Sequence, residues 1–222
     1  SPTEFIRADA IRADSRRALR AVHAAFYLSN QTISIGVIGP GLIGGTLLDQ
    51  LRTQMETLKN EFKIDLRVRG ILNSRKRILS DQGRKLENWR ALLENGAPAD
   101  RDNFITHVQA DHFPHAVIVD CTTSAELTKN YPAWLERGIH IITPNKKANS
   151  SALAFYRQLR SITRATRRSY RYATTVGAGL PIIHTPRHTI QTGPRVRPTD
   201  GSPSRPPSCL FTTFRGHAAP PP

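Results

Sequence analysis

A glycine-rich turn between a short apolar run and a helix-forming segment most constrains what this chain can fold into. The run TISIGVIG, residues 32–39, is rich in β-branched side chains and ends in glycine, which is typical of a buried strand. The segment GLIGGTLLDQLRTQMETL that follows has the leucine spacing of a helix. Between them stands a G-x-G-x-x-G pattern, composed of Gly39, Pro40, Gly41, Leu42, Ile43 and Gly44.

Each glycine of this pattern has a distinct physical role when a strand precedes it and a helix follows. Gly39 permits the tight turn, Gly41 lets the backbone approach a pyrophosphate, and Gly44 allows the helix to pack closely on the strand. The amino-terminal end of the helix favours an anion. The pattern therefore favours dinucleotide binding, with a purely structural turn as the alternative.

Strands and helices alternate along the rest of the chain. Further strands are predicted at residues 64–72, 115–121 and 139–143, with a fifth at 169–175. Helices are predicted at 15–27, 124–138 and 150–169, and residues 80–110 have helical character in pieces. This alternation predicts an α/β fold, a Rossmann-type doubly wound parallel sheet with helices on both faces.

The end of the second predicted strand bears on the choice of dinucleotide. An enzyme that uses NAD places Asp or Glu there to hold the ribose 2′-hydroxyl. This chain instead has the basic run composed of Asn73, Ser74, Arg75, Lys76 and Arg77. Cations there suit the 2′-phosphate of NADP. We therefore expect NADP as the cofactor, with NAD as the alternative and a solvated charge run as the plain structural interpretation.

Two further segments follow strands where ligands of open α/β sheets bind. In VDCTT, Thr122 is a candidate cofactor contact, although a helix cap beside a buried Cys121 explains the same pattern. In TPNKKANS, Lys146 is a candidate for polarising a carbonyl, although lysine pairs are common on surfaces. The histidines and cysteines lack the spacing of a metal site.

The net charge of +15 is concentrated in the last third of the chain. Residues 151–222 hold eleven arginines, no lysine and a single acid, and ten of the sixteen prolines lie in residues 181–222. Such a segment is typical of a disordered tail, whereas a nucleic-acid surface more often interleaves aromatic side chains. A basic nucleic-acid-binding protein is therefore only an alternative. The sequence contains no eighteen-residue apolar stretch, so no membrane helix is predicted.

Taken together, several of these segments resemble homoserine dehydrogenase, and most closely its plant and algal form that is fused to an aspartokinase. The similar segments are LRAVHAAFYLSNQTISIGVIGPGLIGGTLLDQL, DLRVRGILNSRK, VDCT, TPNKKANS and TVGAGLPII. They stand in the family's order and span residues 18–193. The resemblance implies NADP-dependent interconversion of aspartate 4-semialdehyde and homoserine, on the route to threonine and methionine.

The resemblance also implies roles for individual residues. Pro40, Leu42 and Ile43 would contact the cofactor, with Thr122 beside it, and Lys146 would be the catalytic lysine near the nicotinamide and substrate. The family holds a sodium ion through backbone oxygens and one acidic side chain. The backbone positions correspond to Val176, Ala178 and Leu180, and the acidic position is Ala173 here, which argues against the ion.

By the same resemblance the chain divides into three parts. Residues 1–29 would end a preceding aspartokinase regulatory region, 30–180 would form the NAD(P)-binding Rossmann domain, and 181–222 would be the truncated start of a catalytic and dimerisation domain. Pro186 falls inside an expected helix, so we expect 181–222 to be disordered. The family's remaining catalytic residues have no counterpart, so we expect this chain to bind cofactor without turnover. A catalytically inactive NADP-binding remnant is the alternative.

The expected partners follow from the same comparison. They are a small-molecule substrate, an aspartokinase domain in the parent chain, and further copies in a homo-oligomeric parent, with no membrane and no nucleic acid. A plant or algal enzyme of this kind would lie in the plastid, and any other in the cytoplasm.

Overall fold

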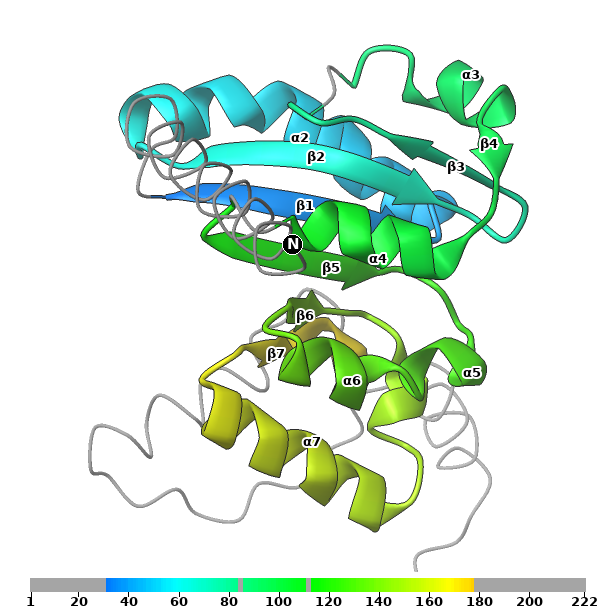
Figure 1. Cartoon of the computed structure of the whole chain (residues 1–222), viewed down its shortest axis with the longest axis vertical. Helices are drawn as coiled ribbons and strands as arrows, with labels where there is room; N and C mark the ends of the chain where they lie inside the picture. The colour runs from blue at the N-terminus through cyan, green and yellow to red at the C-terminus, as the bar shows by residue number, and fades with distance from the viewer. Residues whose placement is uncertain (1–30, 84–85, 111–112, 178–222) are drawn as a thin grey trace, which may run out of the picture. The chain divides into compact units, whose positions relative to one another are not determined.

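A seven-stranded sheet organises the computed structural model, which describes residues 31–83, 86–110 and 113–177 (Figure 1). The strand order is β4-β3-β2-β1-β5-β6-β7. The strands are β1 (Thr32–Ile38), β2 (Asp65–Leu72), β3 (Lys76–Leu79), β4 (Ala97–Pro98), β5 (His115–Asp120), β6 (His140–Ile142) and β7 (Tyr170–Arg171). β1 pairs in parallel with β2 and β5, β5 pairs in parallel with β6, and β3 is antiparallel to β2 and β4. The predicted α/β fold with a largely parallel sheet is confirmed.

Helices follow most of the strands. They are α2 (Leu42–Glu61), α3 (Trp89–Glu94), α4 (Arg101–Gln109), α5 (Ala125–Thr128), α6 (Tyr131–Glu136) and α7 (Leu153–Thr166), with a 3₁₀ turn η1 (Lys146–Ala148). α4 starts at a capping carboxylate, because Asp100 Oδ1 accepts a hydrogen bond of 3.0 Å from the Asn103 N–H. In the same way Ser124 Oγ accepts from the Leu127 N–H at the start of α5.

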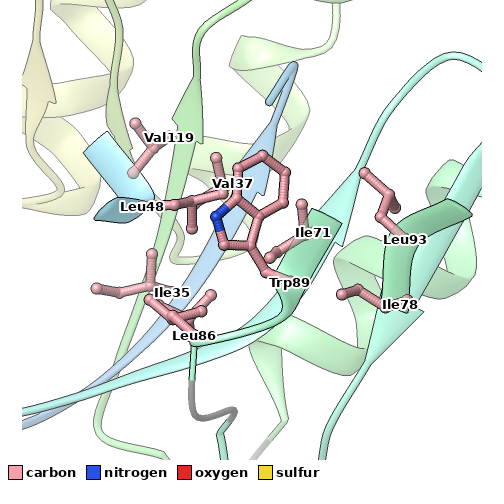
Figure 2. Close-up of a cluster of buried hydrophobic side chains, with 10 residues drawn as sticks. Ile35, Val37, Leu48, Ile71, Ile78, Leu86, Trp89, Leu93 and Val119 are labelled. Atoms are coloured by element: carbon pink, nitrogen blue, oxygen red, sulfur yellow. The ribbon is translucent and has the colours of Figure 1, made fainter. Parts of the chain in front are cut away.

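The alternation of side chains along β1 assigns its two faces to different helices. Ile35 and Val37 point into a buried cluster with Leu48 of α2 and Trp89 of α3, with Trp89 at the centre of the cluster (Figure 2). On the other face, Ser34 Oγ donates to the Val108 carbonyl of α4 at 2.6 Å. In Figure 1, α4 accordingly lies in front of β1 and β5, and α2 lies behind β1 and β2.

Three sequence predictions need correction. The single helix expected at 124–138 is two short helices, α5 and α6, because Pro132 lacks the N–H that would continue α5 into α6. Lys76 and Arg77 belong to β3, so only Asn73, Ser74 and Arg75 of the basic run lie in the turn after β2. The expected fifth strand is only the two residues of β7, followed by a 3₁₀ turn, η2 (Ala173–Thr175).

Several predictions lie outside the described residues. These are the helix at 15–27, the division at 1–29 and the tail at 181–222. The chain separates into two compact units, residues 1–170 and 171–222, and only 171–177 of the second are described. Within the described ranges, every helix is too short or too polar to cross a membrane.

Candidate functional site

A cleft of about 820 Å³ opens where β1, β2 and β5 end. β1 has β2 as its neighbour on one side and β5 on the other. The sheet is therefore extended in opposite directions from β1, and the strand order reverses there. Ligands of open α/β sheets bind at such a reversal, outside the carboxyl ends of the strands. The cleft is lined by the glycine turn after β1, the turn after β2 and the loop after β5, and also by residues of α3, of the segment from β4 to α4, and of α5.

The glycine turn is shaped so that its backbone faces the cleft. Gly39 has φ +80°, and a Cβ there would lie 2.6 Å from Thr122 Cγ2, so only glycine fits. A Cβ on Gly44 would come under 3.0 Å from the Gly39 carbonyl oxygen. A Cβ on Gly41, in contrast, would meet no atom within 4 Å. The first and third glycines are therefore needed by the fold, and the second leaves open space for a ligand.

The start of α2 borders this cleft, because its N-cap, Gly41, is part of the lining. Gly41 is the N-cap, makes no side-chain capping bond, and no acidic residue stands in the first turn. An uncapped helix start with its positive dipole end favours an anion. Leu42 and Ile43 follow, with 89% and 59% of their side chains exposed, and they do not line the cleft, whereas Gly39, Pro40 and Gly41 do.

The turn between β2 and β3 is held by one side chain. Asn73 Oδ1 accepts hydrogen bonds from the Arg75 N–H at 2.8 Å and from the Lys76 N–H at 2.6 Å. This Asx-type turn exposes Ser74 and Arg75, which line the cleft together with Asn73. Arg77 is engaged elsewhere, because its Nη1 donates to the Pro98 carbonyl at 2.9 Å. Of the three cations in the predicted basic run, Arg75 alone lines the cleft.

The loop after β5 is anchored by a fully buried carboxylate, Asp120. Its Oδ1 accepts from the Thr122 N–H at 2.8 Å, and its Oδ2 accepts from the Tyr131 hydroxyl and from Asn145 Nδ2. Burial, with Asp120 close by, raises the pKa of Tyr131 well above its usual range. The phenol therefore stays protonated and acts as a donor to the carboxylate.

Two residues beside this carboxylate line the cleft. Thr122 Oγ1 accepts from the Ser124 N–H at 3.2 Å, which leaves its own proton for a ligand. Burial, and secondarily Asp120, raises the pKa of Cys121 to about 11, so the thiol is neutral at physiological pH.

Lys146 lies in η1, after β6, with an exposed side chain, and it does not line the cleft. Its neighbour Asn145 is buried and ties this turn to the cleft, because Asn145 Nδ2 donates to the Ser124 carbonyl at 3.0 Å. Asn145 Oδ1 also accepts from the Lys147 N–H at 3.0 Å. The structure thus brings the backbone of the Lys146 turn next to a cleft-lining residue.

The proposed sodium ligands receive little support from the described residues. Val176 ends η2 in extended conformation, while Ala178 and Leu180 lie outside the described part of the chain. Ala173 has a methyl group where the family has a carboxylate. The sodium site therefore stays a prediction, with Ala173 as the argument against it. Within the described ranges, moreover, His, Cys, Asp and Glu form no cluster of three that could hold a metal.

Sequence reasoning missed part of the cleft lining. Leu93, Ala99 and Arg101 line the cleft although they lie in the polar segment that was predicted only as helical in pieces. They reach it because β3 and β4 fold back beside β2, and nothing in the periodicity of 80–110 predicts that hairpin. The serine cap at Ser124, which was predicted, is also part of the lining.

Comparison with known proteins gives a consistent result. Residues 39–173 match the family described as homoserine dehydrogenase, NAD binding domain. Two bifunctional aspartokinase/homoserine dehydrogenases of Arabidopsis thaliana, both named as chloroplastic, are 51% and 52% identical over 92% of this chain. The chain spans only 23% of the length of each.

A solved structure shows the same fold. It is a hyperthermophilic archaeal homoserine dehydrogenase in complex with NADPH, with a TM-score of 0.55 and 22% identity. The match covers 68% of this chain and 47% of that one.

Proposed function

This chain belongs to the homoserine dehydrogenase family, and from that membership we propose that it holds NADP for the interconversion of aspartate 4-semialdehyde and homoserine. One observation carries the proposal. The cleft at the ends of β1, β2 and β5 combines an open glycine turn with a basic turn, and no acidic residue ends β2. A dinucleotide with a 2′-phosphate fits that chemistry better than one with a free 2′-hydroxyl.

The pyrophosphate would be held by the backbone rather than by side chains. Gly41 leaves open space beside the start of α2, where the N–H groups have no capping side chain. Gly39, Pro40, Leu42, Ile43 and Gly44 complete this turn. Two negative charges at a helix start gain from the dipole and from several N–H donors together.

The adenosine end would lie at the turn after β2. The Arg75 guanidinium can bind phosphate oxygens through two parallel N–H groups, and the Ser74 hydroxyl can add a third donor. Asn73 contributes indirectly, because its side-chain oxygen is already occupied by the backbone of the turn. Asn73 thus positions Ser74 and Arg75 rather than contacting the phosphate through that oxygen.

The reacting end would lie near Thr122 and Lys146. When bound, NADPH supplies the hydride that reduces the aldehyde. The Thr122 hydroxyl can donate a hydrogen bond to the cofactor, since its oxygen already accepts from Ser124. The Lys146 ammonium would stabilise negative charge on the aldehyde oxygen as it develops. Lys146 is the catalytic residue that we propose within this chain.

Location and partners follow from the relatives. The two Arabidopsis thaliana proteins are named as chloroplastic and as fused to an aspartokinase. We therefore propose that this sequence acts in a plastid, within a longer chain that also carries an aspartokinase domain. Assembly of that longer chain with further copies of itself stays a prediction from the resemblance. Mass spectrometry of proteins from isolated plastids tests the proposed location and fusion. Peptides of this sequence and of an aspartokinase domain should come from one and the same protein band.

Cofactor titration tests the central proposal. NADPH should bind chain 1–222 more tightly than NADH, and Arg75→Ala should weaken NADPH by about ten-fold or more while changing NADH by less than about two-fold. Arg157→Ala removes the same charge from α7, whose Arg157 does not line the cleft, and it serves as the matched control. Equal affinities for the two cofactors, unchanged in Arg75→Ala, would exclude the proposed 2′-phosphate contact.

A further inference from the structure

Arg101 reaches the same cleft as Arg75 from a different part of the chain. The Ala99 N–H donates a hydrogen bond of 2.9 Å to the Arg75 carbonyl, which fixes the strand β4 segment beside the turn after β2. Two residues later α4 begins at Arg101. The start of α4 lies at the same edge of the sheet as the carboxyl ends of β1, β2 and β5 (Figure 1). Ala99 and Arg101 both line the cleft with Asn73, Ser74 and Arg75.

The neighbouring cation Arg77 is not available for this role. Its guanidinium donates to the Pro98 carbonyl and pairs with Asp100 at 3.3 Å, and its side chain is only 18% exposed. Asp100 is thereby engaged on both oxygens, since its other oxygen caps α4. The segment from β3 to the start of α4 therefore engages Arg77 in an ion pair, and it places Arg101 in the lining of the cleft.

Arg75 and Arg101 share a chemical situation that Arg77 lacks. Both side chains are exposed, and neither guanidinium forms a hydrogen bond or ion pair with any residue that the structure describes. A phosphate monoester carries between about one and a half and two negative charges at neutral pH, which is more than one guanidinium balances. The carboxylate that also lines the cleft, Glu126, comes from α5 and is paired with Lys129 at 2.7 Å.

We propose that Arg101 is a second specificity-determining residue, which binds the 2′-phosphate of NADP together with Arg75. This inference rests on the proposed function, because it assigns a residue to the cofactor of that same site. Two guanidinium groups from separate segments would hold a dianion from two directions. They would also explain why one cleft is lined by two arginines that have no partner among the described residues, since like charges disfavour one another.

Small fragments of the cofactor isolate this contact. Adenosine 2′,5′-bisphosphate carries the 2′-phosphate and 5′-AMP does not, so calorimetric titration of chain 1–222 with each, at fixed ionic strength, separates the phosphate from the rest of the ligand. Arg101→Ala should weaken the bisphosphate by about ten-fold or more and 5′-AMP by less than about two-fold. Arg101→Lys should restore part of the loss, because it keeps the charge but not the forked geometry.

Two controls make the result interpretable. Arg157→Ala removes one positive charge away from the cleft, and Arg77→Gln removes the cation whose guanidinium is engaged by Pro98 and Asp100 while keeping a donor for the Pro98 carbonyl. Both should leave the preference for the bisphosphate over 5′-AMP unchanged. Arg75→Ala combined with Arg101→Ala should abolish that preference.

The outcomes separate this inference from the proposed function. If wild-type protein binds NADPH and the bisphosphate but Arg101→Ala behaves like Arg157→Ala, the role of Arg101 is overturned and the proposed function stands. Equal weakening of the bisphosphate and 5′-AMP would also overturn it, since that indicates a general effect of charge. If wild-type protein binds none of these ligands, both proposals fail.

Discussion

Two adjacent glycines at the start of α2 allow a sharp test of the turn geometry. A Cβ on Gly44 would come under 3.0 Å from the Gly39 carbonyl oxygen and 3.2 Å from Cys121 Cβ, so the helix would have to move away from the turn. The atoms nearest to a Cβ on Gly45 would be those of the Arg90 guanidinium and the Trp89 ring, none closer than 3.4 Å, which is ordinary contact. Gly44→Ala should therefore damage the site, and Gly45→Ala should not.

The expected difference in the free energy of unfolding follows from a comparison of the two variants. Each gains about 0.5–1 kcal/mol from the better helix propensity of alanine, and this gain cancels when the two variants are compared. The remaining difference is the overpacking at Gly44, which typically costs about 1–3 kcal/mol. Because the obstacle is a backbone carbonyl and not a flexible side chain, we expect the upper half of that range.

Urea unfolding followed by circular dichroism measures this difference. Gly44→Ala should lower the unfolding midpoint with an unchanged slope, and Gly45→Ala should raise it slightly or leave it unchanged. NADPH titration should show weaker binding for Gly44→Ala alone, because the displaced helix start borders the cleft. Equal stability and equal NADPH affinity in both variants would refute this account of the third glycine.

Three further predictions concern side chains around the cleft. Tyr131→Phe removes a donor from the buried Asp120 carboxylate and should lower the free energy of unfolding by about 1–3 kcal/mol, measured by urea unfolding. Asn73→Asp keeps an oxygen for the turn but adds a negative charge beside the 2′-phosphate, so titration should show NADPH weakened relative to NADH. In a Cys209→Ser background, the Cys121 thiol should react slowly with a thiol reagent at pH 8, faster as the pH approaches about 11, and more slowly again with NADPH bound. Fast labelling at pH 8, or no protection by NADPH, would contradict the last prediction.

The parts of the fold that could be predicted from the sequence depend on local signals. β1 is a run of β-branched residues that ends at Gly39, and strand, turn and helix then follow within a few residues. The same holds for β5 and the serine cap of α5, where Ser124 accepts from Leu127 as its residue type predicts. Because carboxyl ends of parallel strands meet at one edge, these local predictions suffice to place Gly39, Asn73 and Thr122 around one cleft.

The parts that could not be predicted depend on contacts between distant residues. The four residues of β3 and the two of β4 have no periodicity that distinguishes them from loop. The pairing of β3 with β2, and of β4 with β3, decides which arginine reaches the cleft. Arg77 and Arg101 carry the same charge in the sequence, but the Arg77 guanidinium is engaged by the Pro98 carbonyl and by Asp100, and Arg101 lines the cleft while Arg77 does not. Sequence reasoning therefore reaches Arg75 within the basic run, whereas the role that we propose for Arg101 depends on tertiary structure.

The buried Asp120 network joins the proposed cofactor cleft to a lysine that does not line it. Asp120 holds the Thr122 N–H on one oxygen and the Asn145 amide on the other, so one carboxylate connects the loop after β5 to the turn after β6. Thr143 adds a second connection, because its hydroxyl donates to the Asp120 carbonyl at 2.8 Å and accepts from the Asn145 N–H at 2.9 Å. A buried carboxylate with all its donors in place resists rearrangement, since losing any one of them leaves a charge unsatisfied. Asn145→Ala should therefore disturb the position of Lys146 more than the affinity for NADPH. In the full-length enzyme this appears as a loss in kcat that exceeds the change in NADPH binding, and a parallel loss in both would argue that the network supports only the cleft.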